Sequence, residues 1–379
     1  MTTHVFIVDE QSFKVHLEYM FVGTGAVDND KKDKDIDFNG VANSNLHHQR
    51  ENGLVSMMSD FSRVRIGDYV LFYVQSANGK DGKFYGIYKI NSTPFHEPSG
   101  KNQYLRNSLG KNLTFRALIK PYKVYAEGIT EWEALDEIKG INAPNQMVWS
   151  LIYRKLKGNR GNTMVTIYEA ERLFNLIMMK NGNRSIAGVS YSYNKQQQIT
   201  LDAPQKTYTG NTQEIFNVLP RLIAKKHNNQ AFEAHLQMFI TQNLCSHPSL
   251  KLALKVNTIE WLGNEVSCGV GMQRIDVMFS QYVNDIEREI VPIELKAVHA
   301  SKDHIKQISR YINWIEQYYV PNRPSTIRPV LICKASTLSA ATRQAFRDFN
   351  AKYDGRCLPL EYIEFSDNGT DLIFTNTPY

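Results

Sequence analysis

Short apolar runs dominate the first half of the chain. They are rich in Val, Ile, Phe and Tyr, are separated by Gly, Asn, Asp and Pro, and lie at residues 4–8, 68–76, 83–91 and 113–120. Runs of this kind predict strands, and the turn-forming residues between them are typical of a small β-barrel or an open sheet. Thr166 and Glu169 then have the spacing of a capping box, which predicts a helix with an apolar face formed by Ala170, Leu173 and Ile177.

Helices and strands alternate in the second half of the chain. Amphipathic patterns predict helices at residues 230–244, 302–319 and 339–353. Strand-like runs lie at about residues 256–261, 272–279, 290–297, 329–333, 358–365 and 371–376. This order is typical of an α/β domain in which helices pack on a sheet.

A polar stretch with little apolar periodicity, residues 191–210, separates the two patterns. We therefore expect a linker at 191–210 between an N-terminal domain at 1–190 and a C-terminal domain at 211–379. A length of 379 residues agrees with two domains.

Composition narrows the class of protein. Hydrophobic residues make up 42% of the chain, which favours folded domains over general disorder. No apolar run approaches the roughly 20 residues that span a bilayer, and the first residues lack the basic and apolar regions of a signal peptide. We expect a cytoplasmic protein without a membrane partner.

Cysteine and histidine spacing argues against a disulfide framework or a closed zinc site. The 4 cysteines include no C-x-x-C pair, and the 10 histidines include no H-x-x-x-H pair. The formal net charge of +6 is too small to identify a partner by itself.

Two charged strands carry the strongest candidate chemistry. In residues 290–297, apolar side chains alternate with Glu294 and Lys296, so the carboxylate and the ammonium share one face of the strand. In residues 271–279, Asp276 alternates with apolar residues in the same way. Antiparallel pairing about a turn midway between the two places Asp276 opposite Glu294. Two carboxylates and a lysine then converge on one patch of the sheet.

This patch has the chemistry of a magnesium or manganese site. Carboxylates a few Å apart repel each other unless a cation compensates their charge, and hard oxygen ligands suit Mg²⁺ or Mn²⁺. Such a metal lowers the pKa of a bound water, while Lys296 can orient the attacking water or neutralise developing charge. The alternative is an exposed ion pair on one strand face, which a bare Glu-x-Lys pattern often is. The mostly apolar flanks predict burial of both strands and favour the metal site.

The pattern resembles the PD-(D/E)XK nuclease superfamily, in which a helix, three strands, a helix and a fourth strand form the core. The resemblance covers residues 211–335 and implies a restriction-endonuclease-like α/β domain with a mixed sheet flanked by helices. It implies that Asp276 binds the metal and that Glu294 and Lys296 form the E-x-K pair. Glu233, in the preceding helix, is similar to the acidic residue that completes the metal shell in many members. An ordinary solvated glutamate explains Glu233 equally well.

Two further features bear on this resemblance. Gln307 and Tyr311 match the Q-x-x-x-Y helix motif of the RecB-like and mismatch-cleaving branches, which implies that Gln307 faces the catalytic site. The chain departs from the superfamily pattern in having no proline before Asp276.

Basic residues flank the predicted site in two segments. One is a helical stripe and the other a Gly- and Asn-containing loop, formed by Lys302, Lys306 and Arg310 and by Arg154, Lys155, Lys157 and Arg160. Beside a phosphodiesterase site, both are candidates for binding nucleic-acid phosphates without sequence preference. The alternatives are a solvated helix face for the stripe and charge complementarity at a helix C-terminus for the loop.

Residues 65–73, 82–88 and 92–95 resemble the EVE, YTH and PUA-like group of small open β-barrels. The resemblance implies an α+β N-terminal domain that holds a modified or flipped base in an aromatic pocket. Phe72, Tyr85 and Trp132 are the candidates for that pocket. The alternative, that such aromatic residues fill the core, applies to most of them, because strand aromatics fill barrels.

These observations predict a metal-dependent DNA endonuclease of restriction or phage-defence type, a prokaryotic protein whose N-terminal domain senses the base. Its partner is expected to be double-stranded DNA that carries modified bases, and cleavage of both strands favours a homodimer. One alternative is a nuclease of mismatch or repair type. The other is a nucleic-acid-binding module whose nuclease-like domain is inactive, which the intact Asp276, Glu294 and Lys296 argue against.

Overall fold

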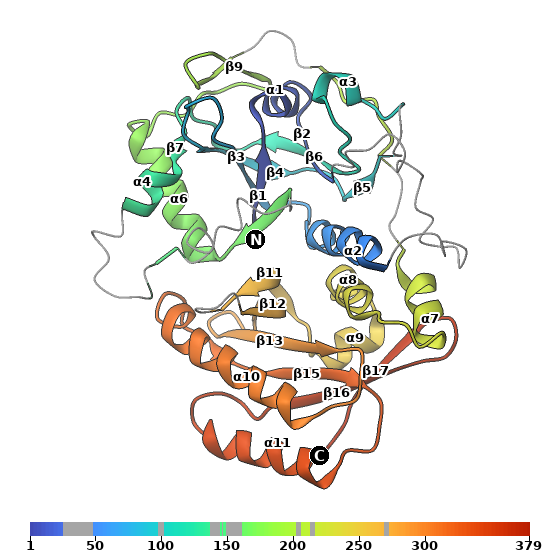
Figure 1. Cartoon of the computed structure of the whole chain (residues 1–379). Coiled ribbons are helices and arrows are strands. Elements are labelled where there is room, and N and C mark those ends of the chain that lie inside the picture. The colour runs from blue at the N-terminus through green and yellow to red at the C-terminus, as the bar shows by residue number, and fades with distance from the viewer. Residues whose placement is uncertain are drawn as a thin grey trace. The chain divides into compact units, whose positions relative to one another are not determined.

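The computed structural model describes residues 1–25, 48–97, 102–136, 145, 147–148, 161–201, 206–212, 217–268 and 273–379. The chain forms two compact units. The first unit contains residues 1–37, 60–141 and 148–216, and the second contains residues 38–59, 142–147 and 217–379. Together they form a mixed α+β protein in which each unit has its own sheet (Figure 1).

The first unit is built around a curled half-barrel sheet, seen at the top of Figure 1. Its strand order is β2-β6-β4-β3-β1-β8, with β5 paired to β6 and β7 paired to β4. The strands are β1 Thr3–Val8, β2 Phe21–Thr24, β3 Tyr69–Val74, β4 Lys83–Ile90, β5 Phe95–His96, β6 Phe115–Pro121, β7 Ile129–Thr130 and β8 Asn162–Val165. The helices are α1 Glu10–Tyr19, α3 Arg106–Leu109, α4 Glu131–Asp136 and α6 Ile167–Lys180.

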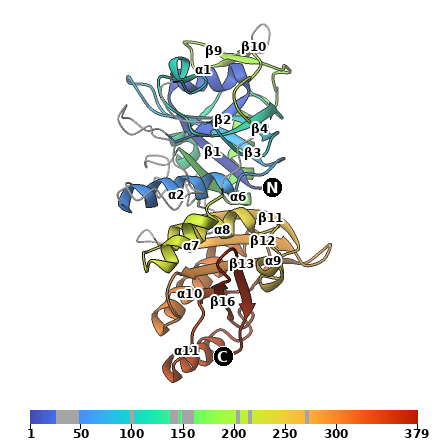
Figure 2. The same cartoon turned by 90° about the vertical axis from the view of Figure 1, so that its right-hand side faces the viewer.

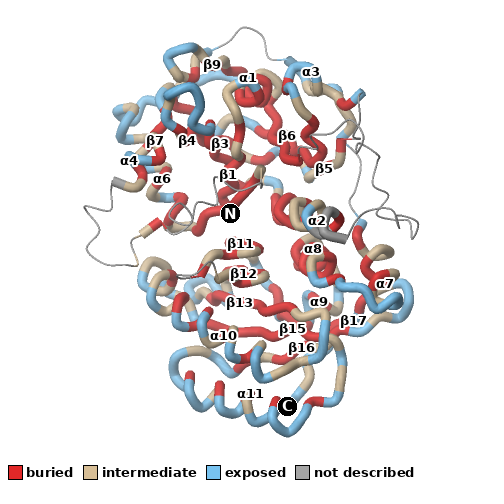
Figure 3. The backbone as a smooth tube through the Cα atoms, in the orientation of Figure 1, coloured by how far each residue is buried: buried red, intermediate tan, exposed pale blue. Residues whose placement is uncertain are grey.

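Sequence periodicity explains the elements of this unit. The four predicted strands are observed as β1, β3, β4 and β6. The capping box is present at the start of α6, where the Thr166 and Glu169 side chains bond each other's backbone amides. The predicted apolar face, Ala170, Leu173 and Ile177, is buried. Burial is concentrated on the central strands and on one side of the helices (Figure 3).

Residues 191–210, which the sequence assigns to a linker, contain a short hairpin formed by β9 Tyr191–Tyr193 and β10 Ile199–Leu201. Tyr191 and Tyr193 are buried, and the Tyr193 hydroxyl lies 3.0 Å from the Tyr85 hydroxyl of β4. The aromatic residues therefore attach this polar segment to the first unit.

The second unit has a mixed sheet with the order β11-β12-β13-β15-β16-β17, and β14 pairs with β13. The strands are β11 Thr258–Ser267, β12 Arg274–Tyr282, β13 Arg288–Lys296, β14 Thr326–Ile327, β15 Val330–Lys334, β16 Glu361–Asp367 and β17 Leu372–Asn376. Flanking helices are α7 Leu219–His227, α8 Glu233–Asn243, α9 Pro248–Ala253, α10 Lys302–Trp314 and α11 Ala340–Lys352, and the π-helical turn η4 Ile315–Tyr319 extends α10 (Figure 2). Strands β11 to β13 are antiparallel, whereas β13, β15 and β16 are parallel.

Helix α2, His48–Ser62, begins in the second unit, although the sequence places its residues in the N-terminal domain. The reason is a buried ion cluster. Glu51 accepts hydrogen bonds from Arg221 Nε at 2.7 Å, Lys225 Nζ at 3.2 Å and His235 Nε2 at 2.9 Å. Burial alone would raise the pKa of Glu51, but the bonds from His235 and Arg221 hold it well below its usual value.

Glu51→Gln should lower the free energy of unfolding by about 3–5 kcal/mol at pH 7, because it leaves buried cations without their counter-charge. Folding lowers the pKa of Glu51. The stabilisation by its carboxylate is therefore fully present at pH values above the ordinary glutamate pKa of 4.5, and it is lost as the pH falls below that value. Urea unfolding at several pH values measures both effects. Asp303→Asn is the control, since the exposed Asp303–Lys306 pair contributes less than about 1 kcal/mol. Equal losses in the two variants would contradict the role of Glu51.

No helix in the described part of the chain is long and apolar enough to cross a membrane.

Candidate functional site

Strands β12 and β13 form the hairpin that carries the predicted carboxylates. Their antiparallel register pairs Val277 with Ile293 and Phe279 with Val291. Continuing this register by one residue places Asp276 opposite Glu294, as the sequence predicts. The neighbouring apolar side chains are fully buried, which confirms the expected burial of both strands.

Lys296 lies at the centre of three carboxyl groups. Its Nζ atom is 2.8 Å from Glu294 Oε1, 3.2 Å from Glu233 Oε1 and 3.9 Å from Asp276 Oδ2. Glu294 and Lys296 come from β13, Asp276 from β12 and Glu233 from the first turn of α8. The structure therefore brings together the four residues that the sequence analysis proposed for the E-x-K pair and the metal ligands, and we call them the carboxylate cluster.

Burial sets the electrostatics of the carboxylate cluster. The Glu294 side chain is 0% exposed, those of Asp276 and Lys296 are 17% exposed, and that of Glu233 is 48% exposed. Burial, followed by the nearby charge of Glu294, raises the pKa of Asp276 well above its usual range. Burial also raises the pKa of Glu294. Burial lowers the pKa of Lys296, but Asp276 and Glu294 outweigh it, so the pKa is raised and the side chain is an ammonium at neutral pH.

Helix α10 orients Glu294 through two of its side chains. The Tyr311 hydroxyl bonds Glu294 Oε2, and Gln307 Nε2 donates to the same hydroxyl at 2.9 Å. Gln307 thus faces the site, and it reaches the Glu294 carboxylate through the Tyr311 hydroxyl. This arrangement makes Gln307 a positioning residue.

Sequence reasoning missed two residues beside the cluster. Gln237 Nε2 donates to the main-chain oxygen of Asp276 at 2.9 Å and to Glu265 Oε1 at 3.1 Å, which ties α8 to the end of β12. His304, near the start of α10, has its pKa lowered by burial and by the Lys296 charge. Gln237 follows Glu233 by one helical turn, so the two side chains share a face of α8, and this spacing could have identified Gln237 from the sequence.

The donor set fits a hard divalent cation. Asp276, Glu294 and Glu233 offer carboxylate oxygens, and when all three are ionised their charge exceeds the single positive charge of Lys296. Among residues that the structure describes, no three or more His, Cys, Asp or Glu side chains are arranged to hold a metal ion together. Asp276 and Glu294, the two largely buried carboxyl groups, are the ones that would hold Mg²⁺, which commonly uses one or two carboxylates with water and substrate phosphate. Glu233 pairs with Lys296, as Glu294 does, but its side chain is half exposed.

The predicted phosphate-binding residues divide into two groups. Lys302, Lys306 and Arg310 are exposed along α10, on the side away from its buried isoleucines. Lys306 pairs with Asp303 at 3.4 Å. The loop residues Arg154, Lys155, Lys157 and Arg160 lie outside the described residues.

The three aromatic residues proposed for a base pocket do not share one site. Phe72 and Tyr85 are 0% and 1% exposed, and both rings pack against Phe13, with centroids 5.2 and 5.3 Å away. Trp132 is 57% exposed on α4. The fully buried pair belongs to the core of the first unit, because strand side chains of period two fill the interior of a curled sheet.

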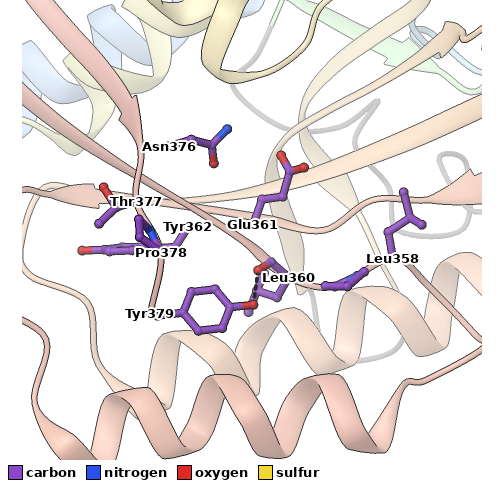
Figure 4. A pocket seen from close by; sticks show the side chains of 9 residues that line it. Leu358, Leu360, Glu361, Tyr362, Asn376, Thr377, Pro378 and Tyr379 are labelled. Carbon is purple, nitrogen blue, oxygen red and sulfur yellow. Dashed lines mark hydrogen bonds between the residues drawn. The ribbon is translucent and has the colours of Figure 1, made fainter.

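An open, mostly apolar pocket of about 440 Å³ lies near the end of the chain in the second unit. Figure 4 shows its lining side chains, with the Tyr379 hydroxyl donating to the Leu360 main-chain oxygen at 2.6 Å. Its lining is Leu358, Pro359, Leu360, Glu361, Tyr362, Asn376, Thr377, Pro378 and Tyr379. None of these residues belongs to the carboxylate cluster.

No protein-family model matches the chain, and no curated protein matches it. Similar solved structures include a hypothetical protein from Leishmania major, at 11% identity and a TM-score of 0.30, covering 48% of this chain and 96% of that one. A protein from Pseudomonas putida has 12% identity and a TM-score of 0.27, covering 46% and 98%. Human THYN1 in complex with DNA containing 5-methylcytosine has 9% identity and a TM-score of 0.25, covering 46% and 96%.

Proposed function

We propose that the second unit is a metal-dependent phosphodiesterase that cuts DNA, of the PD-(D/E)XK type. The observation that carries the proposal is the position of Lys296, whose Nζ atom lies within 4 Å of three carboxyl groups, two of them largely buried. A buried excess of carboxylates is unfavourable unless a cation compensates it. An exposed strand ion pair, the alternative from sequence, would not bury Glu294 completely.

The chain's own residues would perform distinct tasks in hydrolysis. Asp276 and Glu294 would hold Mg²⁺ or Mn²⁺, which when bound supplies charge for the phosphate and a more acidic water. The Lys296 ammonium would orient the attacking water and neutralise charge that develops on the phosphate. Tyr311 fixes one oxygen of Glu294, so the carboxylate presents its other oxygen toward Lys296.

The substrate side of the proposal rests on the first unit and on α10. The half-barrel and its aromatic-rich strands support an EVE- or PUA-like reader of a modified base in double-stranded DNA. The exposed Lys302, Lys306 and Arg310 would bind backbone phosphates. A prokaryotic restriction or phage-defence enzyme acting in the cytoplasm as a homodimer would combine these parts, because two active sites cut two strands.

Metal dependence and preference for modified bases can be tested in one assay. The full chain is incubated with phage genomic DNA, with and without base modification, in Mg²⁺, in Mn²⁺ or in EDTA. We expect cleavage with either metal, complete loss in EDTA, recovery when metal is added back, and faster cleavage of the modified DNA. Undiminished cleavage in EDTA would refute the two-carboxylate mechanism. Preference for mismatched over modified duplexes would favour the repair-type nuclease instead.

A further inference from the structure

Arg274 begins β12 and lies on the same face of that strand as Asp276, because side chains two residues apart point to the same side. Its side chain is 35% exposed. Two residues along a strand span about 6.5 Å, so a group bound to Arg274 would lie beside the metal position and not on it. Arg274 is therefore a cation at the rim of the carboxylate cluster that has no task in holding the metal or in orienting the water.

Neighbouring side chains hold the Arg274 guanidinium in one place. Its Nη1 atom donates to Glu265 Oε2 at 2.9 Å, and Gln237 Nε2 donates to the other oxygen of that carboxylate at 3.1 Å. The main-chain oxygen of Arg274 lies 2.9 Å from the Tyr311 hydroxyl, which also bonds Glu294. Arg274 is thus positioned by side chains that also contact the carboxylate cluster.

Glu265 has an unusual backbone conformation at the point where it meets Arg274. The pairs on either side of it in β11 and β12 keep one antiparallel register, which places Glu265 opposite Asp276. Its φ is 51°, in the left-handed region that residues other than glycine rarely adopt. Strained residues of this kind are found mostly at functional sites, where surrounding contacts hold them. Here the bonds to Arg274 and Gln237 hold the Glu265 side chain.

Most of the hydrogen-bonding capacity of the guanidinium remains for a ligand. A guanidinium carries five N–H groups. Among the residues that the structure describes, the acceptor of the Arg274 side chain is Glu265, which takes one of them. The remaining groups can bind two oxygens of one phosphate, a geometry that arginine provides and lysine does not. The alternative is an ion pair that only joins two strands, and its removal would leave the affinity for DNA unchanged.

The charge balance around the cluster favours an anionic ligand at Arg274. The Lys296 ammonium on the same face of the sheet already lies within 4 Å of three carboxyl groups. A DNA strand carries one negative charge per nucleotide, and the metal would compensate only the phosphate that is cut. A flanking phosphate would meet a surface rich in carboxylates unless a second cation faces it. Arg274 is the cation that β12 supplies there.

We propose that Arg274 binds a phosphate of the DNA strand next to the phosphate that is cut. This assignment rests on the proposed nuclease. It makes the second unit an enzyme for polynucleotides and not for isolated phosphodiesters, since the contact requires a second phosphate on the same strand. The contact gives affinity and fixes how the strand lies along β12, without reading the base sequence.

The salt dependence of DNA binding tests the assignment without any cleavage. The full chain is titrated with a short DNA duplex in EDTA at several salt concentrations. The slope of log K against log salt then reports how many phosphates the protein neutralises. Arg274→Gln should weaken binding and reduce the magnitude of that slope by about 0.9, the loss of one phosphate contact. Arg274→Lys should retain the slope, because it retains the charge.

Arg288→Gln is the matched control for this substitution. Arg288 lies at the opposite end of the paired strands β12 and β13, and its side chain is 29% exposed. Like Arg274, it pairs with a glutamate of β11, with its Nε atom 3.5 Å from Glu260 Oε1. Because it is remote from the carboxylate cluster along the strands, its loss should leave the slope unchanged.

Thermal unfolding of each variant shows whether the fold is kept. If Arg274→Gln unfolds, the double variant Arg274→Gln, Glu265→Gln takes its place, because it removes the ion pair without leaving an unpaired carboxylate. The same reduction of the slope is expected from it.

The outcomes separate this assignment from the nuclease itself. The assignment is overturned if the natural chain does not bind the duplex, if the slope is unchanged without Arg274, or if Arg274→Lys or Arg288→Gln loses as much. An unchanged slope together with metal-dependent cleavage would leave the nuclease standing without this contact. A reduced slope in a chain that never cleaves DNA would instead refute the nuclease, and with it the place of this phosphate beside a cut.

Discussion

Lys296→Met should lower the rate of DNA cleavage by about 10²–10³-fold while the chain still binds DNA, because one stabilising group aimed at the reacting phosphate is lost. The change removes the ammonium that lies nearest to Glu294 and Glu233. Single-turnover cleavage at saturating protein measures the chemical step apart from binding.

Two controls separate catalysis from stability in this experiment. Lys251→Met changes an exposed lysine of α9 and should leave cleavage unchanged. Thermal unfolding of Lys296→Met shows whether the uncompensated Glu294 destabilises the fold. A folded Lys296→Met protein that cleaves at the normal rate would show that Lys296 serves only as an ion-pair partner.

Asp276→Asn should reduce cleavage by at least about 10³-fold, because a bound metal contributes several kcal/mol to the stabilisation of the transition state. In the natural chain the Leu295 main-chain N–H donates to Asp276 Oδ2 at 2.8 Å. The asparagine side chain has the same size, and its oxygen can still accept this hydrogen bond. The same variant should bind Mn²⁺ more weakly than the natural chain in a calorimetric titration without DNA. The metal titration gives a readout that does not depend on activity.

Asp285→Asn is a matched control for this substitution, since Asp285 is exposed in the turn between β12 and β13. It should change neither Mn²⁺ affinity nor cleavage. Equal Mn²⁺ affinity in the natural chain and Asp276→Asn would mean that Asp276 does not hold the metal.

The arrangement of the carboxylates could be predicted because it depends on local pattern. Alternation in the two strands sets which side chains share a face, and a short turn fixes their register. Asp276, Glu294 and Lys296 therefore follow from the sequence alone. Glu233 was a weaker prediction, because its position depends on how α8 packs on the sheet rather than on any periodicity.

Features that depend on distant parts of the chain could not be predicted. Glu51 contacts Arg221 and His235, which lie 170 and 184 residues later, and no local pattern records such pairings. For the same reason, the sequence could not predict that the start of α2 belongs to the second unit. In the first unit, the aromatic content indicated a strand-rich core but could not show which rings are buried, as Phe72 is, and which are exposed, as Tyr122 is, because that depends on how the sheet curls and packs.

The most direct test of the central claim compares the natural chain with an Asp276→Asn, Lys296→Met double variant purified in parallel. Supercoiled plasmid carrying modified bases is incubated with each protein in Mg²⁺, and nicked and linear products are measured over time. Parallel purification matters because any contaminating nuclease accompanies both proteins. The account predicts that the natural chain breaks the plasmid and the double variant does not. Equal cleavage by the two proteins, or intact plasmid with both, would contradict it.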